Sequence, residues 1–229
     1  MPRLYYFTGS KFALENLRER HIKISFADKV NDIFELTPFD FGDDATGRTL
    51  RREWKRQIKA HAKQQGFVCF SHDWRCPAMW GHYSENHYGV CYGFDVEPQK
   101  SEALLKIRYV NKLKPFNRTA LRNQLALNAE LEFAKSTKST VWGYEREWRV
   151  YCSLTQDEIA SKENGEKDFF LPFGDELQLK EVIIGAKSRV SSSDIKSTLN
   201  TNDDVVVRTA RASFREYKIV EQNLEQMKK

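Results

Sequence analysis

The 229-residue chain lacks the features that mark several large classes of protein. It contains no run of eighteen apolar residues, so we expect no membrane span. Its first residues, MPRLYYFTGSKF, lack the continuous apolar region of a signal peptide. It has only four cysteines and no CxxC pair, which favours buried, reduced thiols over a zinc site. These absences predict a cytoplasmic protein without a metal centre.

Glycine-rich nucleotide-binding motifs are missing as well. Neither a GxGxxG motif nor a Walker lysine loop is present, so the sequence does not indicate a common dinucleotide or ATP site. Hydrophobic residues make up 40% of the chain and aromatic residues 13%, which is enough for a packed core. The net charge of +5 permits contact with nucleic acid but does not require it.

Short apolar segments outnumber helical ones along the chain, and several consecutive pairs lack a crossover helix between them. This order favours a mixed α+β fold with a mostly antiparallel sheet and flanking helices. Strands are expected at 4–8, 22–26, 66–71, 88–96, 106–110, 144–151, 169–173, 179–185 and 205–211, and helices at 12–21, 49–65, 77–87, 118–137 and 191–199.

The pattern predicts a single domain over residues 1–215, with helical insertions near 46–65 and 118–137. The polar tail 216–229 is expected to fray, and the polar segment 155–168 to be flexible.

The segment 144-YEREWRVY-151 places charged residues within an otherwise apolar strand pattern. Alternation puts Glu145, Glu147 and Arg149 on one face, while Tyr144, Trp148 and Val150 on the other are expected in the core. One interpretation is a solvated face with a weak ion pair. The other is a site in which a carboxylate binds a sugar hydroxyl and stabilises a cationic sugar transition state.

The expected helix 77–87 carries a cluster of polar aromatic side chains. Helical spacing places Trp80, Tyr83 and His87 on one face and His82 on another. Such rings suit stacking on a flat group such as nicotinamide or a base. The alternative is a core face in which the rings pack and the histidines find hydrogen-bond partners.

Two further features have a structural and a functional interpretation. Asn31 and Asp32 are typical of a turn that caps its own backbone. The segment 48–63 predicts a basic helix whose charges spread over several faces, which favours a solvated helix over a nucleic-acid footprint. Its basic residues are Arg51, Arg52, Lys55, Arg56, Lys59 and Lys63.

A series of motifs resembles an uncharacterised bacterial family known only as domain of unknown function 2971. The resemblance covers roughly residues 1–210, and the family label implies no activity. The motifs are LYYF near the N-terminus, ND at 31–32, CFS at 69–71, MWGHYSENHYGVCYGF at 79–94, WGYEREWR at 142–149 and EVIIG at 181–185.

The order of elements is more remotely similar to that of ADP-ribosyltransferases. This resemblance implies that the sheet is split as it is in those enzymes. That resemblance implies an enzyme that cleaves NAD, a transferase or glycohydrolase, of the kind that acts in bacterial toxins or phage defence. Glu147 would hold the ribose hydroxyl and Glu145 would engage a protein or nucleic-acid acceptor. Residues implied in binding NAD are Tyr6, Thr8, Ser71, Trp80, His82, Tyr83, His87 and Arg149.

Alternatives to this assignment remain open at the level of sequence. Glu181 also opens an apolar strand and is a rival for the functional glutamate. The basic helix 48–63 fits a module that binds or processes nucleic acid, and a sensor that binds a nucleotide without turnover fits the same motifs.

Overall fold

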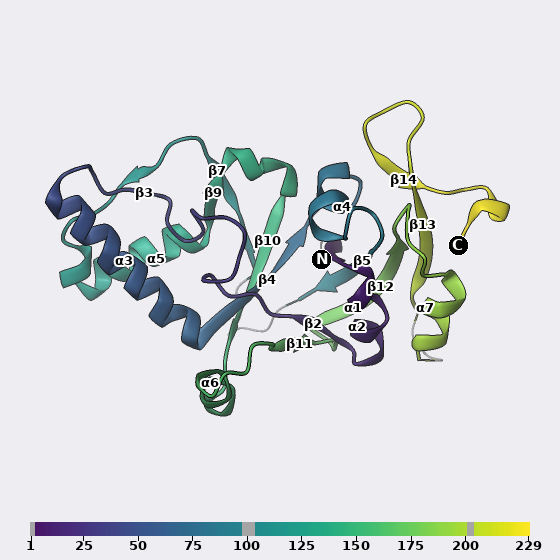
Figure 1. Cartoon of the computed structure of the whole chain (residues 1–229), viewed down its shortest axis with the longest axis horizontal. Helices are drawn as coiled ribbons and strands as arrows, with labels where there is room; N and C mark the ends of the chain where they lie inside the picture. Colours follow the sequence, from purple (N-terminus) through teal and green to yellow (C-terminus); the bar gives the residue numbers. More distant parts are fainter. Residues whose placement is uncertain (1–2, 98–103, 201–203) are drawn as a thin grey trace.

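The computed structural model describes residues 3–97, 104–200 and 204–229. Its main feature is an eight-stranded sheet in the order β14-β13-β12-β5-β1-β4-β10-β6 (Figure 1). The strands are β1 (Arg3–Thr8), β4 (Gln65–Ser71), β5 (Val90–Val96), β6 (Leu104–Lys106), β10 (Glu147–Ser153), β12 (Leu177–Ile184), β13 (Val206–Ala212) and β14 (Ile219–Glu221).

Neighbouring strands of this sheet are antiparallel except β12 and β13, which helix α7 (Ser192–Thr198) connects as a crossover between parallel strands. The mixed α+β class with a mostly antiparallel sheet is therefore confirmed. No helix among the residues that the structure describes has both the length and the apolar character needed to cross a membrane.

Three two-stranded sheets and several short helices surround the large sheet. The pairs are β2 (His21–Lys23) with β11 (Phe170–Pro172), β3 (Phe39–Asp40) with β8 (Lys114–Pro115), and β7 (Arg108–Val110) with β9 (Thr137–Ser139). The remaining helices are α1 (Ser10–Ala13), α2 (Glu15–Arg18), α3 (Ala45–Gln64), α4 (Pro77–Tyr83), α5 (Gln124–Lys135), α6 (Gln156–Glu163), and the 3₁₀ helices η1 (Ala120–Arg122), η2 (Thr140–Glu145) and η3 (Glu225–Met227).

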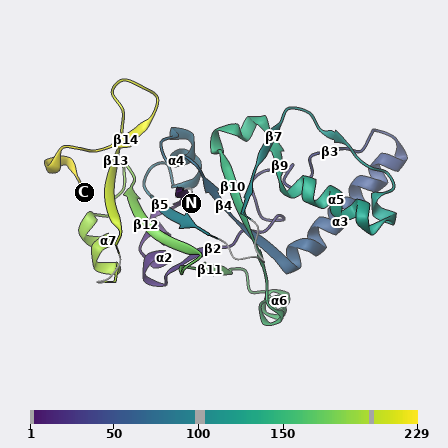
Figure 2. The same cartoon turned by 180° about the vertical axis from the view of Figure 1, so that it is seen from behind.

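Strand alternation sends apolar side chains to both faces of the large sheet. On one face Leu4, Val68 and Val150 form a buried core with residues of α1, α2 and α7. On the other face Phe7 packs against Trp80 of α4. Figure 2 shows the sheet from behind, with α7 at one end and the α3–α5 pair at the other.

Helices α3 and α5 form a lobe at the far end of the molecule from α7 (Figure 1). Trp54 of α3 is fully buried there and packs edge-on against Phe39. All six basic residues predicted in this helix are exposed, as a solvated helix requires. Arg48, Arg52, Lys55, Lys59 and Lys63 are all exposed and recur every three or four residues, so they lie along one stripe.

Several elements differ from the sequence-based expectation for local reasons. The expected helix 118–137 begins only at Gln124, because the Asn123 side chain caps the backbone N–H of Ala126. The segment expected to be flexible, 155–168, contains α6, which a capping box between Thr155 and Glu158 starts.

The C-terminal tail does not fray as expected. Residues 219–221 pair with β13 as an edge strand, and Ile219 is buried against the core of α4. Lys229 donates from its Nζ to the backbone carbonyl of Ser188 at 2.5 Å. One buried isoleucine among polar neighbours was enough to dock a segment that composition alone marks as tail.

Candidate functional site

Strand β10 begins at Glu147, so the prediction of a strand from residue 144 is wrong. Residues 140–145 form η2, and Arg146 has a left-handed backbone with φ of 46°, which turns the chain before the strand starts. Glu145 and Glu147 therefore come from different elements. Tyr144 lies outside the strand; it packs partly buried against the core of α4, and its ring lies 6.1 Å from that of His82.

From Glu147 onward the predicted alternation holds, but the charged face is not solvated. Exposed fractions are 3% for Glu145, 2% for Glu147 and 0% for Arg149. Val150 on the other face is buried in the main core, and Trp148 packs partly buried at its edge. The interpretation of a wet face with a weak ion pair is therefore wrong.

Arg149 lies between two carboxylates. Its Nε donates to Glu147 Oε1 at 2.5 Å, and its two Nη atoms donate to the carboxylate of Glu35 at 2.6 and 2.9 Å. This forked geometry satisfies a fully buried guanidinium, which would be very costly without partners. Glu35 comes from the loop between β2 and β3.

Lys138 of β9 joins the same cluster from the opposite side. Its Nζ donates to Glu145 Oε2 at 2.5 Å and to Glu147 Oε2 at 3.1 Å, so one ammonium group holds both carboxylates close together. Together Glu35, Glu145, Glu147, Lys138 and Arg149 form what we call the charge cluster. With three carboxylates and two cations, it carries one surplus negative charge when all are ionised.

The two carboxylates of the E-x-E pair titrate differently. Burial would raise the pKa of Glu147, but Arg149 and Lys138 outweigh it and lower that pKa to about 2. Burial raises the pKa of Glu145, and neighbouring Glu147 adds to the rise against the opposing effect of Lys138. Glu147 is thus the fixed anion, and Glu145 is the carboxyl that takes up a proton more easily.

A cavity of about 180 Å³ opens onto the charge cluster, and all five of its side chains line the wall. Tyr83 of α4 lines it too, and its hydroxyl donates to Glu145 Oε1. Burial and the neighbouring Glu145 raise the pKa of the Tyr83 hydroxyl well above its usual value, so it stays a donor. Asn31 and Ser25 lie at the same cavity.

Other residues predicted for the site lie near this cavity but are engaged elsewhere. Ser71 pairs with Glu147 across β4 and β10, yet its hydroxyl donates to the backbone carbonyl of Asp73 at 3.0 Å. Tyr6 lines the cavity, and its ring stacks on that of Tyr92 in the main core. Thr8 is buried at the end of β1, beside Val90.

The helix expected over 77–87 ends at Tyr83. Glu85, Asn86 and His87 all have positive φ values, of 52°, 53° and 73°. His87 therefore does not share a helix face with Trp80, although its ring stacks on the indole at 6.4 Å. Trp80 is fully buried and donates to the backbone carbonyl of Trp74, while His82 is exposed.

The rival glutamate lies in a different part of the sheet. Glu181 on β12 forms an ion pair with Arg208, and Arg208 also pairs with Glu221 at 2.5 Å. Four strand spacings separate β12 from β10, which corresponds to about 19 Å. Glu181 does not line the cavity at the charge cluster.

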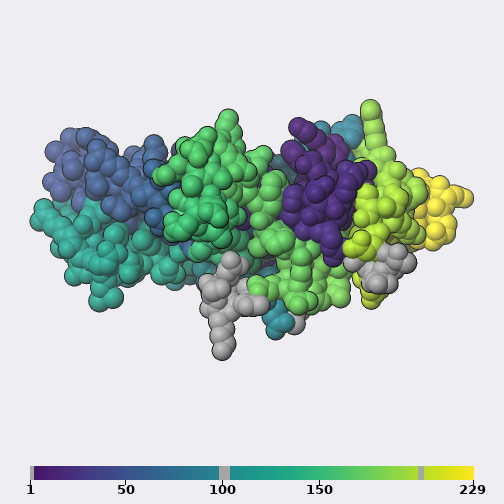
Figure 3. Space-filling model, turned by 90° about the horizontal axis from the view of Figure 1, so that it is seen from below, coloured from purple at the N-terminus to yellow at the C-terminus, as the bar shows by residue number. Residues whose placement is uncertain are grey.

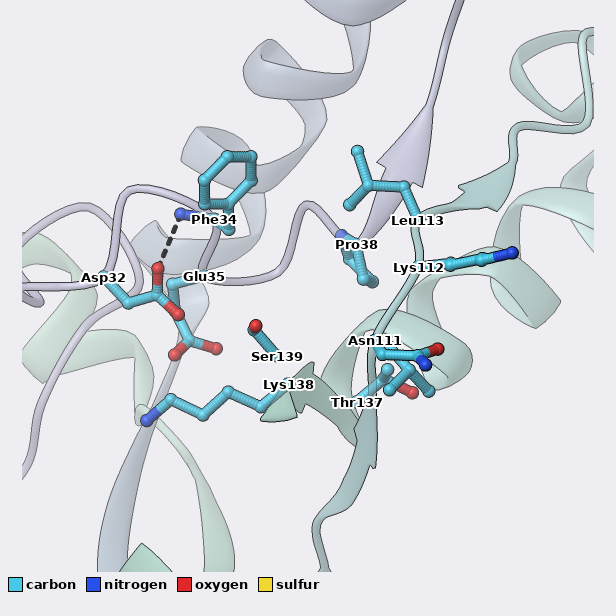
Figure 4. Close-up of a pocket in the computed structure, with 11 residues that line it drawn as sticks. Asp32, Phe34, Glu35, Pro38, Asn111, Lys112, Leu113, Thr137, Lys138 and Ser139 are labelled. Carbon is cyan, nitrogen blue, oxygen red and sulfur yellow. Dashed lines mark hydrogen bonds between the residues drawn. The ribbon is translucent and has the colours of Figure 1, made fainter. Parts of the chain in front are cut away.

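Asp32 makes the expected turn, because its Oδ1 accepts from the backbone N–H of Phe34 at 2.9 Å. It also lines a second cavity, of about 190 Å³, on the other side of Glu35 and Lys138. Figure 4 shows Asp32, Glu35 and Lys138 with their polar ends on one side of this cavity. Glu35 and Lys138 thus line both cavities.

Sequence reasoning missed Glu35 and Lys138, the two cluster residues outside the YEREWRVY segment. Neither stands in a recognisable motif, since Glu35 lies in a loop and Lys138 falls at the expected end of a helix. One signal was available: an arginine on a strand with apolar neighbours must find carboxylate partners when it is buried.

Comparison with known proteins gives a match to one family model over part of the chain, and no activity. Residues 79–150 match the model of a family described as protein of unknown function (DUF2971), which confirms the resemblance seen in the motifs over that segment. The matched segment contains every member of the charge cluster except Glu35, and it contains Tyr83. No curated protein and no solved structure matches the chain.

Proposed function

We propose that the chain cleaves the N-glycosidic bond of NAD or a closely related nucleotide, in the manner of ADP-ribosyltransferases or NAD glycohydrolases. The observation that carries this proposal is the surplus carboxylate of the buried charge cluster, which faces a cavity. A site with one unbalanced negative charge in a low-dielectric environment favours a ligand or transition state that is positively charged there.

The bond chemistry matches this demand. When the bond between ribose C1′ and the nicotinamide nitrogen breaks, the electron pair goes to the ring, which leaves as a neutral molecule. Positive charge then develops on C1′ and its ring oxygen. Ionised Glu147, which lines the cavity, stabilises that charge or accepts a hydrogen bond from a ribose hydroxyl.

Glu145 has the properties required for the second half of the reaction. A water molecule or another acceptor adds to C1′ and must release a proton. The raised pKa of Glu145 makes it a stronger base than an ordinary glutamate, and the Tyr83 hydroxyl holds its carboxyl in place. Water as acceptor gives hydrolysis, and a side chain or base gives ADP-ribosyl transfer.

The size of the cavity limits which part of the substrate enters. Its volume of about 180 Å³ is below the range of about 300–1,000 Å³ for pockets that enclose a whole ligand. A cavity of this size takes only one end of a dinucleotide, and the rest of the molecule extends outside.

The direct test is release of nicotinamide from NAD by the purified protein, compared among the wild type, Glu145→Gln and Tyr83→Phe. Glu181→Gln is the matched control, because it neutralises a buried, ion-paired glutamate elsewhere in the fold, on β12. We expect Glu145→Gln to lower turnover about 100-fold or more and Glu181→Gln to leave it within a few fold. Equal effects of the two substitutions, or no release by the folded wild type, would refute the proposal.

Measuring thermal stability beside nicotinamide release distinguishes an enzyme from a protein that binds NAD without turnover. If NAD raises the melting temperature of the wild type but releases no nicotinamide, the chain is a nucleotide sensor rather than an enzyme.

The exposed stripe of α3 favours a second candidate function, contact with nucleic acid. Arg52, Lys55 and Lys59 are the centre of this stripe. If it binds a phosphate backbone, affinity for DNA or RNA falls steeply with salt, and the triple alanine variant loses both the affinity and most of the salt dependence. Salt-independent binding would exclude this function for α3.

A further inference from the structure

A lysine-rich surface lies beside the cavity at the charge cluster. Two adjoining cavities of about 500 and 540 Å³ have Lys29 and Lys167 in common, and together they form what we call the lysine basin. Figure 3 views the molecule from the side on which α6, drawn in green, projects. The lysines that line the basin are Lys23, Lys29, Lys63, Lys162 and Lys167.

The lysine basin and the charge-cluster cavity meet at Ser25. This residue lines both the cavity at the charge cluster and the first cavity of the basin. Its backbone bridges to Phe67 of β4, which fixes the border between them at the sheet. The two cavities thus share one wall residue at the point where this segment joins the sheet.

The positive charge of the basin is only partly balanced. Lys23 pairs with Asp168 at 2.5 Å, and Lys63 is 3.9 Å from Glu163. Lys29, Lys162 and Lys167 form no ion pair with any residue in the described parts of the chain. Five lysines thus line the basin against three carboxylates, Asp168, Glu163 and Glu166, next to a cavity with a surplus carboxylate.

Lys162 is the best-positioned of these cations. Its Nζ donates to the backbone carbonyl of Ala62 at 2.7 Å and lies over the ring of Phe26. Burial lowers the pKa of the Lys162 ammonium to about 8; Asp28 opposes that shift and Lys29 adds to it, so the charge is only partly compensated in the free protein. A bound anion would supply that compensation.

We propose that the lysine basin binds the pyrophosphate group of the substrate whose ribose lies at the charge cluster. This inference rests on the proposed function and extends it, since it requires a substrate that carries phosphates beyond its glycosidic ribose. Opposite surplus charges on the two sides of Ser25 match a molecule with a cationic ring at one end and a dianionic linkage further along. A nucleoside without phosphates would use only the charge-cluster side.

The binding test uses calorimetry with inorganic pyrophosphate and with NAD on the full chain. The basin variant is Lys29→Ala/Lys167→Ala, and the control is Lys11→Ala/Lys196→Ala, which removes two exposed lysines elsewhere. We expect the basin variant to weaken both ligands about tenfold, as two partly screened charge contacts would. The control should stay within twofold. Equal affinities in the two variants, or no pyrophosphate binding by the wild type, would overturn the inference.

Two further arms separate the possible sources of phosphate and the two proposals. One contrary outcome is that the basin variant binds an oligonucleotide more weakly than the wild type does but binds pyrophosphate equally well. In that case the basin binds nucleic acid instead, and the inference is overturned. Where nicotinamide is released, KM for NAD should rise in the basin variant, and KM for nicotinamide riboside, which has no phosphate, should not. Basin-dependent pyrophosphate binding without any nicotinamide release would refute the proposed function alone.

Discussion

Removing the ammonium of Lys138 is the sharpest test of the charge cluster. In Lys138→Met the side chain keeps its apolar stem, but Glu145 and Glu147 lose the cation that bridges them at 2.5 and 3.1 Å. Breaking a buried ion pair by removing one partner costs about 3–5 kcal/mol, because the remaining charge stays buried. We expect the free energy of unfolding at pH 7 to fall by about that amount.

The pH dependence of this loss identifies its cause. Without Lys138, burial and the neighbouring Glu147 raise the pKa of Glu145 further, so Glu145 protonates at a higher pH and its repulsion with Glu147 disappears. Urea unfolding at pH 7 and pH 5 should therefore show a smaller difference from the wild type at pH 5. Adding Glu145→Gln to Lys138→Met should recover a large part of the loss at pH 7.

Lys55→Met is the matched control, since Lys55 is exposed on α3. We expect it to change the free energy of unfolding by less than about 0.5 kcal/mol. If Lys138→Met costs no more than this control, or if Glu145→Gln does not rescue it, the five charges do not act as one buried cluster.

Two other measurements test separate parts of the structure. Glu147 has a pKa of about 2 in the folded chain and about 4.5 in the unfolded chain, so above pH 4.5 it contributes about 3 kcal/mol to the free energy of unfolding. The stability of the wild type should therefore fall as the pH drops from 4.5 toward 2. Urea unfolding of Glu147→Gln should show a shallower decline over the same range. Gly89→Ala would place a Cβ 1.9 Å from the Thr8 carbonyl oxygen, so we expect a loss of about 2 kcal/mol or more by thermal unfolding. The control Gly81→Ala, in α4 with open space around it, should be neutral or stabilising, and an equal loss there would show that the Gly89 contact does not decide the effect.

Sequence patterns predicted the sheet better than the site. Apolar strands such as 66–71 and 88–96 were recognised within two residues because alternation and buried runs are local signals. The start of β10 was misplaced because the strand pattern of YEREWRVY continues through residues that a left-handed Arg146 turns away. No periodicity reports a single backbone angle of that kind.

Three of the five residues of the charge cluster were predicted, because only contacts between sequence neighbours can be read from a local pattern. Glu145, Glu147 and Arg149 stand close together in the sequence, so their proximity was visible. Glu35 lies 114 residues from Arg149, and only the folded sheet brings the two together. The aromatic helix was overestimated, since His87 reaches Trp80 through a turn of three left-handed residues rather than along a helix.

The span of the Glu35–Arg149 contact also determines when the cluster can exist during folding. Closing a loop of this length costs conformational entropy, and contacts offset that cost only once both ends have docked on the sheet. Arg149 therefore meets its second carboxylate only after β2, β4 and β10 are in place. Fragments that lack the N-terminal loop leave this arginine with Glu147 alone. The complete charge cluster and its cavity therefore form only in the fully folded chain. Partly folded forms lack the site, whichever ligand it binds.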